Sequence, residues 1–140
     1  MVDAANGSAS DHPLSLNQGA WEIKFSPDGQ WAFVTNEFLP PPGLASSAIS
    51  VLATSNHSEM LTVPVGRCPI DLAVLGNGRY VYVTNWGDNT VSVVDTATFQ
   101  AVATVNVTVR PSLTLRVAPL SLVTPLTLKV LPDPLNVQVV

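Results

Sequence analysis

The chain contains the string Tyr80-Val81-Tyr82-Val83-Thr84-Asn85, and a diverged copy, Trp31-Ala32-Phe33-Val34-Thr35-Asn36, lies 49 positions earlier. The likeness extends upstream, because Ile23–Gln30 aligns with Leu72–Arg79 at the same offset. Self-similarity at a fixed period is the signature of a repeat architecture. We therefore expect two copies of one structural unit.

The likeness continues downstream of these strings at a different offset. Ile49-Ser50-Val51-Leu52 aligns with Val91-Ser92-Val93-Val94, and here the offset is 42 positions. The first copy therefore carries 7 extra residues, which lie within the proline-rich stretch Glu37–Ser47. A period of about 40–45 residues in strand-forming sequence is typical of β-propeller blades.

Each copy is expected to form four short strands. In the second copy these are Ile70–Val74, Tyr80–Thr84, Thr90–Val94 and Ala101–Val107, with Gly, Asn and Asp residues at the turns between them. The second strand of each copy is apolar at both alternating sets of positions, so we expect it to be covered on both faces, as when blades stack around an axis. The fold class is therefore all-β, with four-stranded antiparallel blades of an incomplete propeller of about two blades.

Four segments follow from this organisation. They are a flexible lead-in at 1–18, the first repeat at 19–66, the second repeat at 67–108, and an irregular apolar tail at 109–140. The tail has five prolines, no glycine and no aromatic residue, and the repeat pattern stops after Pro111. Two hypotheses account for it: a change of reading frame soon after Pro111, or a genuine apolar tail that pairs as an edge strand.

Composition excludes several classes of function. The net charge of −4 and scattered basic residues argue against a nucleic-acid partner. With Cys68 as the only cysteine, no disulfide forms within the chain, and we expect this residue to be small, apolar and buried. Met1–Ser8 does not resemble a signal peptide, and prolines break the long uncharged stretch at 38–58, so no membrane span is expected.

The sequence predicts no catalytic residue, metal site or cofactor site. His12 and His57 lie in predicted loops without a second ligand at metal spacing. Gly76-Asn77-Gly78-Arg79 lies between two predicted strands, so we interpret it as a hairpin turn and not as a phosphate loop. Asp28, Asp88 and Asp95 are expected to cap turns, and we do not expect these three residues and Asp71 to form an acid–base pair.

The best candidates for binding follow the repeated Thr-Asn pair. They are Glu37 and Phe38 in the first copy and Trp86 and Asp88 in the second, because these residues are expected on loops at one rim of the propeller. Trp86 is the strongest of them, since indole offers apolar area and an N–H donor. The alternative for Trp86 is packing between blades. The prolines at 40–42 form a second candidate, a stiff loop that could present a recognition edge.

The second copy, from Tyr80-Val81-Tyr82-Val83-Thr84-Asn85 through Gly87-Asp88-Asn89 to Thr98, resembles the YVTN-family β-propeller repeat. The first copy is similar to a more diverged member, and the resemblance covers about residues 19–108. It implies WD40-like four-stranded blades and a bacterial or archaeal origin. Members are commonly exported or surface-associated, which is the only indication of localisation.

Taken together, these features predict a non-catalytic module that binds a protein or cell-surface ligand and is a fragment of a larger propeller. Closed propellers need about four to eight blades, so two blades leave apolar sheet faces through which the chain could self-associate. Two alternatives remain open. One is a fragment of a lactonase-like or dehydrogenase-related propeller enzyme, and the other is a truncated product without independent function.

Overall fold

The computed structural model consists of strands and turns. It describes residues 19–36, 38–39, 44–45, 47–56, 58–107, 115–117, 128–130 and 137–139. In the part of the chain that the structure describes, no helix has the length and apolar character needed to span a bilayer.

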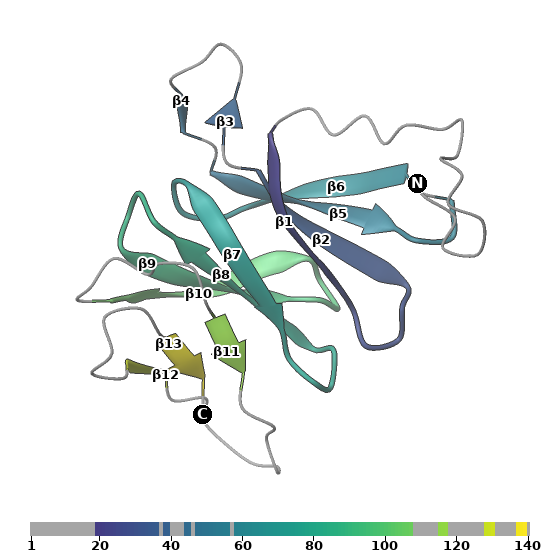
Figure 1. Cartoon of the computed structure of the whole chain (residues 1–140). Coiled ribbons are helices and arrows are strands. Elements are labelled where there is room, and N and C mark those ends of the chain that lie inside the picture. Colours follow the sequence, from purple (N-terminus) through teal and green to yellow (C-terminus); the bar gives the residue numbers. More distant parts are fainter. Residues whose placement is uncertain are drawn as a thin grey trace.

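Two antiparallel four-stranded sheets form the body of the molecule (Figure 1). In each sheet the strands are adjacent in chain order, as in a propeller blade. The first blade has the order β1-β2-β5-β6 and the second has the order β7-β8-β9-β10. Their bounds are β1 Ala20–Phe25, β2 Trp31–Asn36, β5 Ala48–Ala53, β6 Ser58–Pro64, β7 Pro69–Val74, β8 Tyr80–Asn85, β9 Thr90–Asp95 and β10 Gln100–Asn106. The predicted fold class is confirmed, and the four strands expected in the second copy are each found within one residue at either end.

Equivalent tight turns join the first two strands of each blade. Gly29 and Gly78 hold positive φ angles of 70° and 75°, which a residue without a side chain adopts at no steric cost. The Gly78 N–H donates to the Leu75 carbonyl at 2.7 Å, and the Gly29 N–H donates to the Ser26 carbonyl at 2.9 Å. The hairpin interpretation of residues 76–79 is confirmed.

The two blades pack face to face and share one apolar core. Each blade contributes four aliphatic or aromatic side chains that are 0% exposed. They are Phe33, Ile49, Val51 and Val63 from the first blade and Leu72, Val81, Val83 and Val94 from the second. At one end of this core the Trp31 ring meets the Phe99 ring edge-on, with centroids 5.1 Å apart. Aromatic pairs favour this arrangement.

The second strand of each blade is buried on both faces, as its sequence predicts. In β2 the Phe33 side chain faces the second blade, while Val34 lies on the opposite face and is 1% exposed. In β8 the opposite set of positions faces the neighbouring blade. Val83 belongs to the shared core, whereas Tyr82, the equivalent of Phe33, is 1% exposed and lies on the other face of the second blade.

The repeated asparagines tie adjacent strands together. Asn85 Nδ2 donates to Thr90 Oγ1 and to Ser92 Oγ, both at 2.9 Å, and Asn36 Nδ2 donates to Ser50 Oγ at 2.9 Å. Each repeated asparagine thus bonds side chains at or on the neighbouring strand of its blade. Both asparagines lie at the ends of extended strands.

Left-handed backbone occurs elsewhere. Among the described residues other than glycine, positive φ angles occur at Cys68, Asn89 and Phe99. Asn89 lies in the turn after β8, where an asparagine tolerates this conformation at small cost. The left-handed asparagine of the second blade is therefore Asn89 in the loop and not the repeated Asn85.

Two smaller sheets complete the described residues. In the insert of the first copy, β3 (Phe38–Leu39) pairs with β4 (Leu44–Ala45). In the tail, β11 (Leu115–Val117), β12 (Leu128–Val130) and β13 (Val137–Val139) form a sheet of their own in the order β11-β13-β12.

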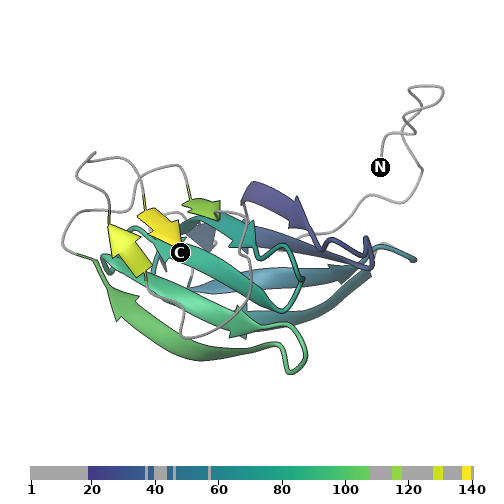
Figure 2. The same ribbon diagram turned by 90° about the horizontal axis from the view of Figure 1, so that it is seen from below.

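The tail strands lie beside the second blade, on the side away from the first (Figures 1 and 2). Of the three tail strands, β11 contacts strand β7 of the second blade. The described tail strands therefore pair with one another and not with the edge of a blade, and the edge-strand hypothesis stays a prediction for the rest of the tail. Strands of three residues agree with a proline-rich sequence, since proline removes a ladder donor. The reading-frame hypothesis stays a prediction.

Candidate functional site

The predicted binding residues lie at one end of the two blades. The loop after β8 is located where β7 begins, and the insert of the first blade occupies the equivalent place after β2 (Figure 1). The linker of residues 65–68 joins the two blades at this same end, because Val65 N–H donates to the Ser47 carbonyl at 2.8 Å. We call this end the linker rim. Phe38 lies in β3, in the insert at this rim, and Glu37 lies outside the described residues.

The loop after β8 is bonded to the linker through the main chain. Trp86 N–H donates to the Cys68 carbonyl at 2.9 Å, and Gly87 N–H donates to the Arg67 carbonyl at 3.0 Å. These bonds hold the backbone on both sides of the indole. The indole itself stays 41% exposed. A large aromatic side chain is thus presented to solvent from an anchored loop.

Asp88 is engaged with the linker and not directed at a ligand. Its Oδ2 accepts from Arg67 N–H at 2.8 Å, and its Oδ1 accepts from Arg67 Nε at 2.6 Å. The Arg67 backbone N–H and then its guanidinium lower the pKa of the Asp88 carboxyl. Asp88 therefore positions the rim loop. The sequence predicted that Asp88 caps its own turn, whereas in the structure it bonds Arg67 in the linker.

Cys68 differs from the expectation of a buried apolar residue. The side chain is half-buried, and the backbone has a φ of 52°. Its carbonyl accepts the Trp86 N–H, so the linker conformation at Cys68 serves the rim loop.

Gly66 explains why the linker can cross the end of β8 so closely. A Cβ atom at this position would lie 2.7 Å from Cγ and Nδ2 of Asn85, which is buried and bonded to Thr90 and Ser92. Glycine avoids this overlap because it has no Cβ. The repeated Asn85 and the linker are thus packed against each other, which fixes the position of the linker rim.

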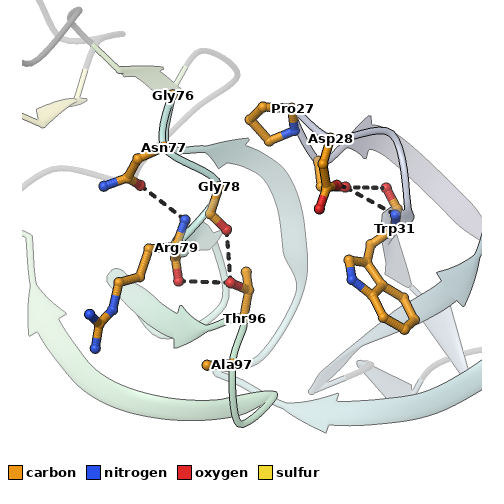
Figure 3. A pocket seen from close by; sticks show the side chains of 10 residues that line it. Pro27, Asp28, Trp31, Gly76, Asn77, Gly78, Arg79, Thr96 and Ala97 are labelled. Carbon is orange, nitrogen blue, oxygen red and sulfur yellow. Dashed lines mark hydrogen bonds between the residues drawn. The ribbon is translucent and has the colours of Figure 1, made fainter.

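The opposite end of the blades carries a groove that the sequence did not indicate (Figure 3). Its volume is about 670 Å³, and it lies between the first turn of each blade and the last turn of the second. The lining residues are Ser26, Pro27, Asp28, Trp31, Gly76, Asn77, Gly78, Arg79, Thr96 and Ala97. Each turn could be predicted from the sequence. Which turns lie side by side could not, because their proximity depends on how the two blades pack.

Most polar groups of this groove are used within their own turns. Asp28 accepts from Ser26 Oγ and from Gln30 N–H, and these bonds lower the pKa of its carboxyl. Thr96 Oγ1 donates to the Gly78 carbonyl at 2.8 Å. The guanidinium of Arg79 points away from Pro27 and Asp28 (Figure 3) and lies 3.7 Å from an Asp95 oxygen.

The remaining two aspartates, Asp95 and Asp71, also bond to neighbours in sequence. Asp95 accepts from Ala97 N–H at 2.8 Å, which confirms a turn cap, and Asp71 accepts from Leu72 N–H within its own strand. Among the described residues, no three His, Cys, Asp or Glu side chains are grouped as a metal site requires. His12 and His57 lie outside those residues.

The chain matches no family model, and no curated protein matches it. Among solved structures, it is similar to hydrazine synthase from Kuenenia stuttgartiensis, with a TM-score of 0.61 and 26% identity. That match covers 71% of this chain and 26% of the hydrazine synthase chain. The chain therefore spans about a quarter of that protein chain.

A second similar structure is the dihydro-heme d1 dehydrogenase NirN in complex with DHE. Its TM-score is 0.52 at 22% identity, and the match covers 61% of this chain and 17% of NirN. At this identity the likeness shows the fold alone. Both neighbours are β-propeller-type proteins, so the two sheets described above are blades of the propeller type.

Proposed function

We propose that this chain is a YVTN-type propeller module, part of a larger propeller, and that it binds a protein or cell-surface ligand at its linker rim. The observation that carries the proposal is the exposed indole of Trp86 on a loop whose backbone is anchored at both Trp86 and Gly87. The YVTN assignment rests on the sequence resemblance and on blades that agree with it.

An anchored aromatic side chain is suited to recognition. Tryptophan is enriched among the residues that contribute most to binding free energy. A loop that is already ordered loses little conformational entropy when a partner binds, so more of the contact energy appears as affinity. The ion pair between Arg67 and Asp88 and the approach of Gly66 to Asn85 keep this loop in place.

The nature of the ligand follows from the same resemblance. YVTN proteins are commonly exported or surface-associated, which favours a protein or glycan partner outside the cytoplasm. The hairpin of β3 and β4 extends this rim from the first blade, and Phe38 and Leu39 form its first strand. We propose that the hairpin of β3 and β4 and the Trp86 loop contact the same ligand.

The enzyme alternative stays a prediction. A lactonase-like or dehydrogenase-related propeller collects its polar side chains from several blades. The groove of about 670 Å³ is the place where these two blades would contribute, but its carboxylate and hydroxyl groups are engaged in turns. Binding at the linker rim is therefore the function that the geometry supports better.

Defined arrays of peptides and glycans test the proposal. Each ligand bound by the wild-type chain is titrated against Trp86→Ala and against the control Trp21→Ala, which removes an indole that is 57% exposed on β1. We expect Trp86→Ala to weaken binding at least about tenfold, the scale of a binding hot spot, and Trp21→Ala to leave it unchanged. Equal affinities for wild type and Trp86→Ala on every bound ligand would refute a site at Trp86.

A further inference from the structure

The groove between the turns of the two blades contains two polar groups that no turn uses. Asp28 Oδ1 accepts from Ser26 Oγ and from Gln30 N–H, whereas Asp28 Oδ2 accepts no hydrogen bond from another residue in the described part of the chain. The indole N–H of Trp31 likewise has no acceptor among the described residues. In Figure 3 the indole nitrogen lies on the side of the ring that faces Thr96 of the second blade. One acceptor and one donor are thus available to a ligand.

The internal repeat shows that the turn itself does not need the charge of Asp28. The equivalent residue of the second blade is Asn77, whose Oδ1 accepts from Arg79 N–H at 3.0 Å, just as Asp28 Oδ1 accepts from Gln30 N–H at 3.0 Å. A neutral amide oxygen therefore closes the same turn. The carboxylate of Asp28 adds a second, charged oxygen to the groove, and its lowered pKa keeps it ionised at neutral pH.

The charges around the groove disfavour an ionic ligand. Arg79 is the only basic residue among the described residues that line it, and its guanidinium is directed away from Asp28, 3.7 Å from an Asp95 oxygen and 5.4 Å from the centroid of the Tyr80 ring (Figure 3). An anion would therefore meet the Asp28 carboxylate without a facing cation. A cation would be attracted by Asp28, but it offers no acceptor to the N–H of Trp31.

A hydroxyl-bearing ligand satisfies both groups. A hydroxyl donates to a carboxylate and accepts from an N–H, and a sugar ring carries several hydroxyls together with apolar C–H groups that can contact the Pro27 ring. The volume of about 670 Å³ is within the range of small-molecule sites.

We propose that this groove binds a neutral saccharide, with Asp28 Oδ2 accepting from one sugar hydroxyl and the Trp31 indole N–H donating to another. The site is separate from the linker rim, because it lies between the first turn of each blade and the last turn of the second, at the opposite end of the blades. It does not depend on the ligand proposed for that rim.

NMR titration tests the proposal on the wild-type chain. The indoles of Trp21, Trp31 and Trp86 are the only ones in the sequence, so each gives its own N–H signal in isotope-labelled protein, and Trp31→Phe identifies the signal of Trp31. Glucose, galactose, mannose, N-acetylglucosamine and their disaccharides are added in turn. We expect at least one of them to shift the Trp31 signal to saturation and to leave the Trp21 signal in place.

Two pairs of variants test the roles of the two groups, with binding followed through the backbone N–H signals of the groove. Asp28→Asn copies the turn of the second blade and removes the charge, so it should raise the dissociation constant at least about tenfold. The matched control Glu22→Gln removes one negative charge from β1, outside the groove, and should leave it unchanged. Trp31→Phe, which keeps an aromatic ring, should also weaken binding, whereas Trp21→Phe should not.

Three results would overturn the proposal. They are a Trp31 signal that no saccharide shifts, equal weakening by Asp28→Asn and Glu22→Gln, and a primary amine such as ethylamine that binds through Asp28 where no saccharide does. A saccharide that shifts only the Trp86 signal would also overturn the groove site, while it would support a glycan site at the linker rim. The failure of one site is therefore distinguishable from the failure of the other.

Discussion

The two blades share a sequence pattern and a strand order, yet their first strands have opposite environments. Ile23 on β1 is 45% exposed, whereas its equivalent Leu72 on β7 is 0% exposed. The second blade is covered by the first blade on one side and is buried on the other, while most of the side chains of β1 are exposed. Position in the stack therefore determines the burial of a blade, even where the repeat specifies equivalent residues.

The largest expected difference is between these two equivalent positions. Leu72→Ala leaves a cavity in the core between the blades and should lower the free energy of unfolding by about 3 kcal/mol. Ile23→Ala removes a half-exposed side chain and should cost less than about 1 kcal/mol. Urea unfolding measures both, and similar losses would show that β1 is buried in solution.

The linker between the blades gives the next effect. Gly66→Ala places a Cβ 2.7 Å from the Asn85 side chain and forces it away from Thr90 and Ser92. We expect a loss of about 2 kcal/mol, typical of overpacking. Gly76→Ala is the control, since a Cβ there meets nothing within 4 Å. Equal stabilities for the two variants in thermal unfolding would contradict the close packing of the linker.

Phe33 and Tyr82 are equivalent residues that differ by one hydroxyl. The Tyr82 hydroxyl is buried and has no hydrogen-bond partner in the described part of the chain. An unpaired buried polar group costs about 1–3 kcal/mol. Tyr82→Phe, which reproduces the first repeat, should therefore stabilise the chain by about 1 kcal/mol, and Phe33→Tyr should destabilise it. A Tyr82→Phe variant that is less stable than wild type would show that this hydroxyl is bonded.

The same hydroxyl predicts a loss of stability at high pH. Burial, with a smaller contribution from Tyr80, raises the pKa of Tyr82 to about 12 from an ordinary value of 10.0. The unfolded chain loses this proton at a lower pH than the folded chain does. The ionisation of Tyr82 therefore leaves the free energy of unfolding unchanged below pH 10 and lowers it as the pH rises from 10 towards 12. Unfolding midpoints between these pH values should fall more steeply for wild type than for Tyr82→Phe; parallel curves would exclude this cause.

The smallest effect concerns the ion pair at the linker rim, for which the first blade has no counterpart in the described residues. Arg67 lowers the pKa of Asp88, so the contribution of Asp88 is present above the ordinary carboxyl pKa and is lost as the pH falls through the lowered value. Because both groups are solvent-accessible, Asp88→Ala should lower the melting temperature only slightly. It should weaken ligand binding more, because the Trp86 loop loses its anchor; unchanged binding would argue against a positioning role.

Much of each blade could be predicted from local sequence. Alternating apolar residues located the strands of the second copy within one residue, and Gly29 and Gly78 marked the tight turns correctly. The signal for contacts across blades is weaker. The bonds between Arg67 and Asp88 join residues 21 positions apart, and neither residue is unusual for a loop.

The candidate site shows the same division. Trp86 and Asp88 were chosen because they follow the repeated Thr-Asn pair, and both lie at the linker rim. The half-buried, left-handed Cys68 and the groove between the turns were missed. Both depend on where the second blade sits relative to the first, which no periodicity encodes.

Strands, turns and the antiparallel order within a blade follow from the chain's own residues, because they depend on neighbours in sequence and on side chains that alternate between two faces. The burial of Leu72, the exposure of Phe25, and the meeting of the linker with Asn85 depend on packing between blades. Apolar burial is non-directional and depends on the area removed from water, so equivalent residues acquire different environments once one blade is covered and the other is not.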